Sequence, residues 1–126
     1  MKRVGYLHEK VYAEDNIELA DDKARRNKSI RCGIKQHDKN RLKENKELSD
    51  KLRDLIYQTS EYSTFIIYEP KERLISRLPY YPDRITHHAI MNIMEPIWTS
   101  IFIDQTYSSI RNRGIHKAEY DLFKVL

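Results

Sequence analysis

The sequence is a 126-residue chain with a net charge of +4, in which 40% of the residues are hydrophobic and 33% are charged. This length fits one small domain or a part of a larger protein. No stretch has the roughly 18 consecutive apolar residues that a membrane span requires. The single cysteine, Cys32, excludes an internal disulfide framework and a cysteine-rich zinc site, and it favours a reducing compartment such as the cytoplasm.

Basic residues are concentrated in the first half of the chain. Residues 1–60 contain 15 Lys and Arg and 11 Asp and Glu, whereas residues 61–126 contain 8 of each. Between residues 23 and 46 there are ten basic residues and two acidic ones. Such a segment suits a polyanion, most simply a phosphate backbone; a solvated helical face is the alternative. The residues expected to contact nucleic acid here are Arg25, Arg26, Lys28, Arg31, Lys35, Lys39 and Arg41.

The first 60 residues are predicted to be helical. Residues 3–26 read as helix in two pieces, with a break near Asp15 and Asn16, because apolar side chains recur at helical spacing on either side. A second long helix is expected over residues 35–56, with its charged first half projecting into solvent or onto nucleic acid. The apolar seam of this helix consists of Leu48, Leu52 and Leu55, flanked by Leu42 and Ile56.

A β-hairpin is predicted between residues 63 and 78. Its first strand is the β-branched and aromatic run 63–68, and a polar break containing Pro70 separates it from a second run, 73–78. Because side chains alternate along a strand, Arg73, Ile75 and Arg77 are expected on one face. Of the aromatic residues around the hairpin, Phe65 is expected in the core, while Tyr80 and Tyr81 suit either the core or base stacking.

The strongest helical pattern covers residues 83–102. Its apolar side chains leave little polar face, so the helix is expected to be buried on most sides and to need a packing partner. Asp83 is expected to accept hydrogen bonds from the first helical turn. Pro96 lacks a backbone donor, which predicts a kink or a second helix that starts at Glu95. A last helix should follow Gly114.

From the hairpin onward the chain contains RLP, two aromatics, PDR, HHAI, MEP, TYS and RGIH, in that order. These residues resemble the N-terminal and fingers region of bacterial reverse transcriptases of the group II intron and diversity-generating retroelement kind. The likeness is densest over residues 61–126. It implies an α+β fold, mostly helical with one antiparallel β-hairpin, with a basic helical region at 1–60 and a fingers region at 61–126.

The resemblance also implies what the region does in the whole enzyme, an RNA-directed DNA polymerase. RNA template and primer duplex would be partners, and the incoming deoxynucleoside triphosphate (dNTP) would meet cations of the hairpin: Lys71 near the tip, with Arg73 and Arg77. The catalytic aspartates and the Mg²⁺ ions belong to a palm expected after the last residue, and no YxDD-like sequence occurs here. The fragment is therefore expected to be inactive alone, with no catalytic residue or metal ligand of its own.

Three further arginines match positions of the family pattern. Arg84 of the PDR motif suits either template phosphate or an acidic neighbour. Arg111 and Arg113 precede a helix where relatives carry a Gly-Arg-Gly or Gly-Lys-Gly step, and Asn112 replaces the first glycine. Asn tolerates positive φ, so the turn is expected to persist. Two arginines beside a helix N-terminus suit an anion.

Two alternatives to a polymerase fragment stay open. One is a freestanding RNA-binding or retroelement accessory module, and the other is a helical protein-interaction adaptor. The five histidines lack the spacing of a metal site, and Cys32 has no evident partner base. No membrane partner is expected, and the oligomeric state is open.

Overall fold

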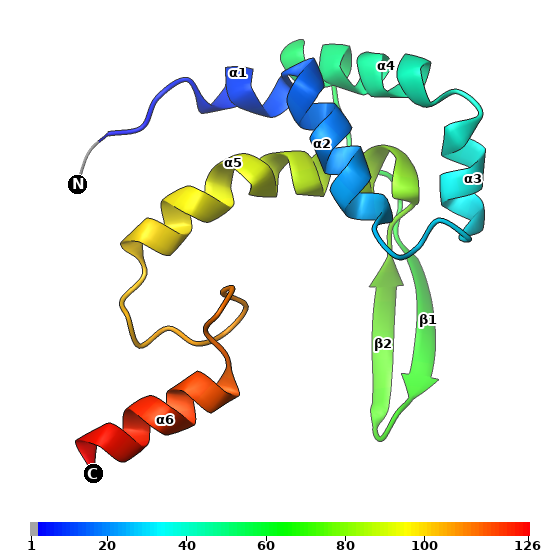
Figure 1. Cartoon of the computed structure of the whole chain (residues 1–126). Helices are drawn as coiled ribbons and strands as arrows, with labels where there is room; N and C mark the ends of the chain where they lie inside the picture. The colour runs from blue at the N-terminus through cyan, green and yellow to red at the C-terminus, as the bar shows by residue number, and fades with distance from the viewer. Residues whose placement is uncertain (1–2) are drawn as a thin grey trace. The chain divides into compact units, whose positions relative to one another are not determined.

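The structure, a computed structural model, describes residues 3–126, and the chain divides into two compact units, 1–93 and 94–126. The described residues form six α-helices and one two-stranded antiparallel sheet (Figure 1). This confirms the mostly helical α+β fold with a single hairpin. The first unit contains the whole of the predicted region 1–60 together with the hairpin and the start of the following helix.

The N-terminal helices are shorter than predicted. Helices α1 (Leu7–Tyr12) and α2 (Glu14–Arg25) meet at Ala13, whose extended backbone (φ −52°, ψ 133°) breaks the helix slightly earlier than expected. The predicted single helix over residues 35–56 is wrong, because it is divided into α3 (Cys32–Asp38) and α4 (Arg41–Arg53). The helical path is interrupted at Asn40 (φ −134°, ψ 28°). The interruption lets α3 bury its own inward side chains while α4 packs against α1 and α2.

The core of the first unit is small and is built from α2, α4 and the start of α5. Its fully buried apolar side chains are Ile17, Ala20, Leu48, Ile85 and Ala89. Leu48 and the partly buried Leu52 confirm part of the predicted seam. Leu55 lies beyond the end of α4, where it has a positive φ of 58° and is exposed. Leu42, in the first turn of α4, is also exposed. Leu55, the i+7 position of the predicted seam, is therefore not on the buried face of α4, because the helix ends before it.

The hairpin consists of β1 (Ser63–Tyr68) and β2 (Glu72–Arg77), and its position confirms the prediction to within one residue. Phe65 pairs with Ile75, and Ser63 pairs with Arg77. Directly paired residues share a face of the sheet. Phe65, Ile75 and Arg77 therefore lie on the same face, and Arg73 is further along that face toward the tip.

The chain enters α5 through the irregular turn η1 (Tyr80–Arg84). The prediction that Asp83 accepts hydrogen bonds from the first turn of α5 is wrong. Asp83 is buried, and it accepts hydrogen bonds from the Tyr57 hydroxyl at 2.6 Å and the Ser60 backbone N–H at 3.0 Å. Burial by itself would raise the pKa of Asp83, but these hydrogen bonds outweigh it and the pKa is lowered. Asp83 thus joins the end of the α4–β1 connection to the turn.

Helix α5 (Ile85–Ile101) continues through Pro96, so no second helix begins at Glu95. Only Ile85, Thr86 and Ala89 are buried. The prediction of a helix buried on most sides is therefore wrong for this chain. Its large exposed apolar side chains are Ile90, Met91, Trp98 and Ile101, and Phe102, directly after its end, is exposed as well. The reason is that only the first two turns of α5 contribute to the small core of the first unit.

The second unit ends in helix α6 (Ile115–Val125), which begins directly after Gly114 as predicted. Asn112 has a positive φ of 63°, which confirms that it can take the place of a glycine in this turn. No residue of α6 is buried. Over residues 3–126, no helix combines the length and the apolar character needed to cross a bilayer.

Candidate nucleic-acid interface

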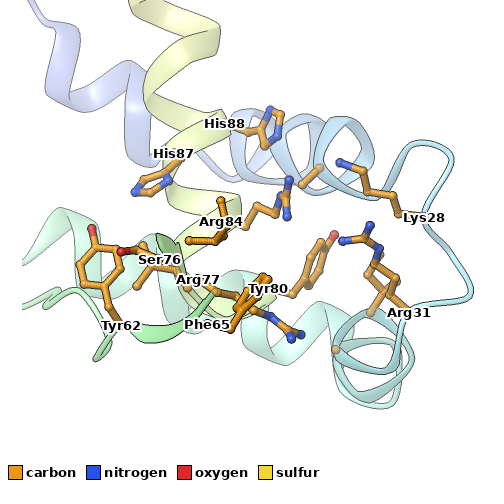
Figure 2. A pocket seen from close by; sticks show the side chains of 15 residues that line it. Lys28, Arg31, Tyr62, Phe65, Ser76, Arg77, Tyr80, Arg84, His87 and His88 are labelled. Carbon is orange, nitrogen blue, oxygen red and sulfur yellow. The ribbon is translucent and has the colours of Figure 1, made fainter. Parts of the chain in front are cut away.

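The first unit contains a cavity of about 610 Å³, here called the basic groove (Figure 2). Its walls come from the hairpin, the turn η1, the first turn of α5, and the loop between α2 and α3. Its basic and titratable side chains are Lys28, Arg31, Arg77, Arg84, His87 and His88. None of the lining residues, all of which belong to the described part of the chain, is Asp or Glu. The groove therefore presents positive charge without an internal counter-charge.

Three local features place the four groove cations Lys28, Arg31, Arg77 and Arg84. Backbone turns hold the α2–α3 loop, because Lys28 N–H donates to the Arg25 carbonyl at 2.9 Å and Arg31 N–H donates to the Lys28 carbonyl at 3.0 Å. Arg77 ends β2, and Arg84 ends η1. Within residues 3–126, none of the four side chains forms a hydrogen bond or an ion pair. Arg31, Arg77 and Arg84 are exposed and Lys28 is partly buried, so these cations are accessible to an anionic ligand, with which they would form charge-assisted hydrogen bonds.

The pKa of His88 reflects the field in the groove. Burial lowers it, and the positive charges of Arg84, Lys23 and Lys28 lower it further. A proton on His88 is thus opposed by the same cations that would attract an anion. An anion bound in the groove would oppose this effect and raise the pKa of His88.

Aromatic side chains line the hairpin side of the groove. Tyr62 is 60% exposed and Phe65 is 46% exposed. The prediction that Phe65 belongs to the core is therefore wrong, because its strand face opens onto the groove instead of the apolar cluster. Tyr80 also lines the groove, and it packs against the core on its other side.

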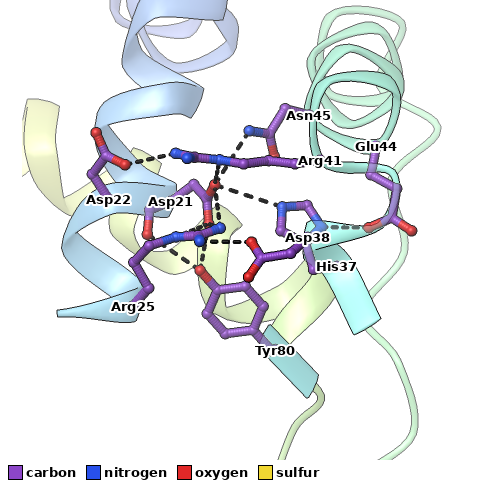
Figure 3. A network of polar contacts seen from close by, with 9 residues as sticks. All are labelled: Asp21, Asp22, Arg25, His37, Asp38, Arg41, Glu44, Asn45 and Tyr80. Carbon is purple, nitrogen blue, oxygen red and sulfur yellow. Dashed lines mark hydrogen bonds and ion pairs between the residues drawn. The ribbon is translucent and has the colours of Figure 1, made fainter. Parts of the chain in front are cut away.

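A polar cluster, here called the Asp21 network, is centred on Asp21 (Figure 3). Its other members are Asp22, Arg25, His37, Asp38, Arg41, Glu44, Asn45 and Tyr80. Asp21 is fully buried on α2. It accepts hydrogen bonds from Arg25 Nη2 at 2.9 Å, from Arg41 Nε at 2.5 Å and from the Tyr80 hydroxyl. His37 Nε2 stands 3.6 Å from Asp21 Oδ2, which is an ion-pair distance and too long for a hydrogen bond.

The Asp21 network decides the role of two predicted nucleic-acid contacts. Besides Asp21, Arg25 pairs with Asp38 at 2.6 Å, and Arg41 pairs with Asp22 at 2.6 Å. Both guanidinium groups are thus occupied within the protein. Burial of Asp21 would raise its pKa, but the hydrogen bonds and cations around it prevail and lower it, so the carboxylate is charged.

The other predicted cations divide in the same way. Arg113 is occupied in the second unit, where it donates to the Ile103 carbonyl at 3.2 Å and stands 3.5 Å from the Asp104 carboxylate. Arg73 lies outside the groove on the face that carries Arg77. The remaining cations are exposed and have no side-chain partner within residues 3–126: Arg26, Lys35, Lys39, Lys71, Arg73 and Arg111.

Sequence reasoning singled out the groove cations one by one but missed their convergence, and it missed Asp21, His37 and His88. The spacing of Asp21 and Arg25, four residues apart on one helix, was the available signal for their ion pair. No local pattern identifies His37 as its neighbour, because the two residues lie on different helices.

Among the described residues 3–126, no group of three or more His, Cys, Asp or Glu is arranged to hold a metal ion. No protein-family model matches the chain, and no curated protein matches it.

The buried His37 predicts a pH dependence of stability. It lies between Asp21 and Glu44 and stacks on Tyr81 at 5.3 Å between ring centroids. Burial lowers its pKa, but the two carboxylates raise it more, so the net shift is upward from 6.5. The stability that this shift contributes is fully present below the unfolded pKa of about 6.5 and is lost as the pH rises through the folded pKa.

We therefore expect the urea midpoint of unfolding to fall as the pH is raised above about 6.5. His37→Gln should remove most of this slope. His116→Gln is the matched control, because His116 is almost fully exposed and its replacement should leave the slope unchanged. An equal slope in the His37→Gln variant would contradict the role given to His37.

Proposed function

We propose that this chain is the N-terminal and fingers portion of a reverse transcriptase, an RNA-directed DNA polymerase, which binds RNA template and primer and contacts the incoming dNTP. The motif order from the hairpin to residue 116 supports the enzyme class. The groove supports the chemistry: four cations without carboxylate partners converge on a cavity lined by no acidic residue. Nucleic acid and nucleotides are the abundant cellular ligands that match such a surface.

The hairpin supports the dNTP part of the proposal. Arg73 and Arg77 share one face, and Lys71 lies in the connection between the strands. Phosphoryl transfer depends largely on positioning and charge neutralisation, which cations aimed at a triphosphate supply. Arg73 and Arg77 are both candidates for the triphosphate contact, because they lie on the same face of the hairpin.

The resemblance implies Mg²⁺ in the whole polymerase. The described residues of this chain do not fit that ion, since they hold no suitable cluster of ligands. The proposal therefore gives this chain the binding of phosphates and no step that requires a metal, and the fragment alone is expected not to extend a primer. A cytoplasmic location belongs to the same proposal.

One observation favours a second function, that of a protein-interaction adaptor. Helices α5 and α6 carry large exposed apolar side chains, among them Trp98, Ile101 and Phe123. Exposed apolar patches commonly mark protein–protein contacts. An adaptor would not need the unpaired cations of the groove, so nucleic-acid affinity separates the two functions. A freestanding RNA-binding module would share that affinity, and only the continuation of the reading frame distinguishes it from a polymerase fragment.

The proposal predicts salt-dependent binding of a primed RNA template. The logarithm of the affinity should fall by about 0.7 to 0.9 for each phosphate contact per tenfold rise in salt. Arg84→Gln should weaken binding and reduce the slope by about one contact. Fluorescence anisotropy across a salt series measures both quantities.

Arg53→Gln is the matched control, because it changes the net charge equally. Arg53 lies outside the groove and pairs with Asp50 at 3.2 Å and Asp54 at 3.1 Å. Its replacement should leave the slope unchanged. An affinity that does not vary with salt, or equal losses in the two variants, would contradict a phosphate site in the groove.

A further inference from the structure

We propose that the basic groove binds an unpaired nucleotide, with its base against Tyr62 and Phe65 and its phosphate at Lys28 and Arg31. This inference rests on the proposed function and deepens it, because it names the chemical class and the orientation of the ligand. It concerns the cavity between the hairpin and the helices, which is distinct from the hairpin tip.

First, the two ends of the groove differ in the chemical character of their side chains. Figure 2 shows Tyr62 and His87 toward one end, and Lys28 and Arg31 at the opposite end, with Arg77 and Arg84 between them. A simple anion would need only the cationic end. A ligand that uses the whole groove must carry negative charge at one end and a flat apolar group at the other.

The second step is the state of the aromatic side chains. Phe65 on β1 and Tyr62, which directly precedes β1, both line the cavity and are substantially exposed. Proteins bind single-stranded nucleic acid with exposed aromatic rings beside cations, because the bases stack on the rings while the backbone phosphates contact the cations. Arg84 adds a planar cation that can also lie against a base.

The third step is size. A volume of about 610 Å³ lies in the range of cavities that hold small-molecule ligands. A nucleotide fits this range, whereas a duplex does not. A paired base also has both faces covered by its neighbours, so it cannot stack on Tyr62 or Phe65. The groove should therefore prefer an unpaired nucleotide, which comes either from a single strand or from a free nucleoside triphosphate.

The test compares five probes on the purified chain by fluorescence anisotropy and competition. They are a six-residue single-stranded oligonucleotide, the same oligonucleotide in a duplex, an abasic oligomer of equal length, a dNTP, and inorganic triphosphate. The single strand should bind roughly tenfold or more tightly than the abasic oligomer, because stacking of even one base contributes about this factor. It should also bind more tightly than the duplex.

Two variants and a matched control locate the stacking. Tyr62→Leu and Phe65→Leu should each lower single-strand affinity by roughly tenfold and leave the affinity for the abasic oligomer unchanged. The abasic oligomer thus also reports that the variants are folded. Tyr68→Leu removes an exposed ring from β1, the strand of Phe65, but from the opposite face of the sheet, and should have no effect.

The outcomes separate this inference from the proposed function. Equal binding of the single strand, the duplex and the abasic oligomer would overturn the nucleotide groove while phosphate binding stands. Binding of none of the probes would overturn both. Competition by dNTP but not by inorganic triphosphate would support the groove with a free nucleotide as its source, and single-strand binding that dNTP does not displace would support a strand nucleotide.

Discussion

Asp21→Asn is expected to lower the free energy of unfolding of the first unit by about 3 kcal/mol. Removing one partner of a buried ion pair costs about 3 to 5 kcal/mol, because it leaves uncompensated buried charge. The lower end applies because Arg25 and Arg41 keep Asp38 and Asp22 as second partners. The fully buried His37 would retain only Glu44. Urea unfolding followed by circular dichroism measures the change.

Asp22→Asn is the control for this experiment. Asp22 is the next residue on α2 and also pairs with Arg41, but its side chain is 63% exposed. Exposed ion pairs contribute about 0 to 1 kcal/mol, so this substitution should have a small effect. Similar losses from the two substitutions would show that the buried network does not dominate the stability of the unit.

Leu48→Ala is expected to cost about 3 kcal/mol. Leu48 is fully buried and packs with Ile17 and Ile85 in the only buried apolar cluster of the described residues. Truncation of a buried leucine removes its transfer free energy and leaves a cavity, which together cost about 2 to 5 kcal/mol. The small size of the core leaves few other contacts to compensate. The measurement is the midpoint of urea unfolding.

Leu42→Ala provides the comparison on the same helix. Leu42 is 78% exposed in the first turn of α4, so its replacement should change stability by no more than about 0.5 kcal/mol. A large effect at Leu42 and a small one at Leu48 would contradict the assignment of Leu48 to the buried face of α4.

Local patterns were sufficient for the hairpin. The β-branched run 63–68, the break at Pro70 and the period of two placed both strands within one residue, and they placed Arg73, Ile75 and Arg77 on a common face. The positive φ at Asn112 agrees with the expectation that Asn, which tolerates this conformation, stands at a glycine position of the turn. These features depend on backbone sterics and on neighbours a few residues apart, which a sequence contains directly.

The division of α3 from α4 was not predictable in this way. No Pro or Gly marks the break near Asn40, and the lower helix propensity of Asp38 and Asn40 is too weak a signal to end a helix by itself. The break places His37 beside Asp21, an interaction between residues 16 positions apart. The contribution of this interaction to stability depends on burial and on the arrangement of three helices, so it cannot be predicted from the local sequence.

The candidate site likewise depends on contacts between residues that are distant in the sequence. The sequence by itself determined the hairpin, the fold class and the concentration of basic residues, because composition and short-range periodicity carry them. Only the tertiary structure decided which cations are available. It pairs Arg25 and Arg41 with buried or neighbouring carboxylates, and it leaves Lys28, Arg31, Arg77 and Arg84 around an acid-free groove. Ion pairing falls off steeply with distance, so it depends on which side chains the fold brings within a few ångströms.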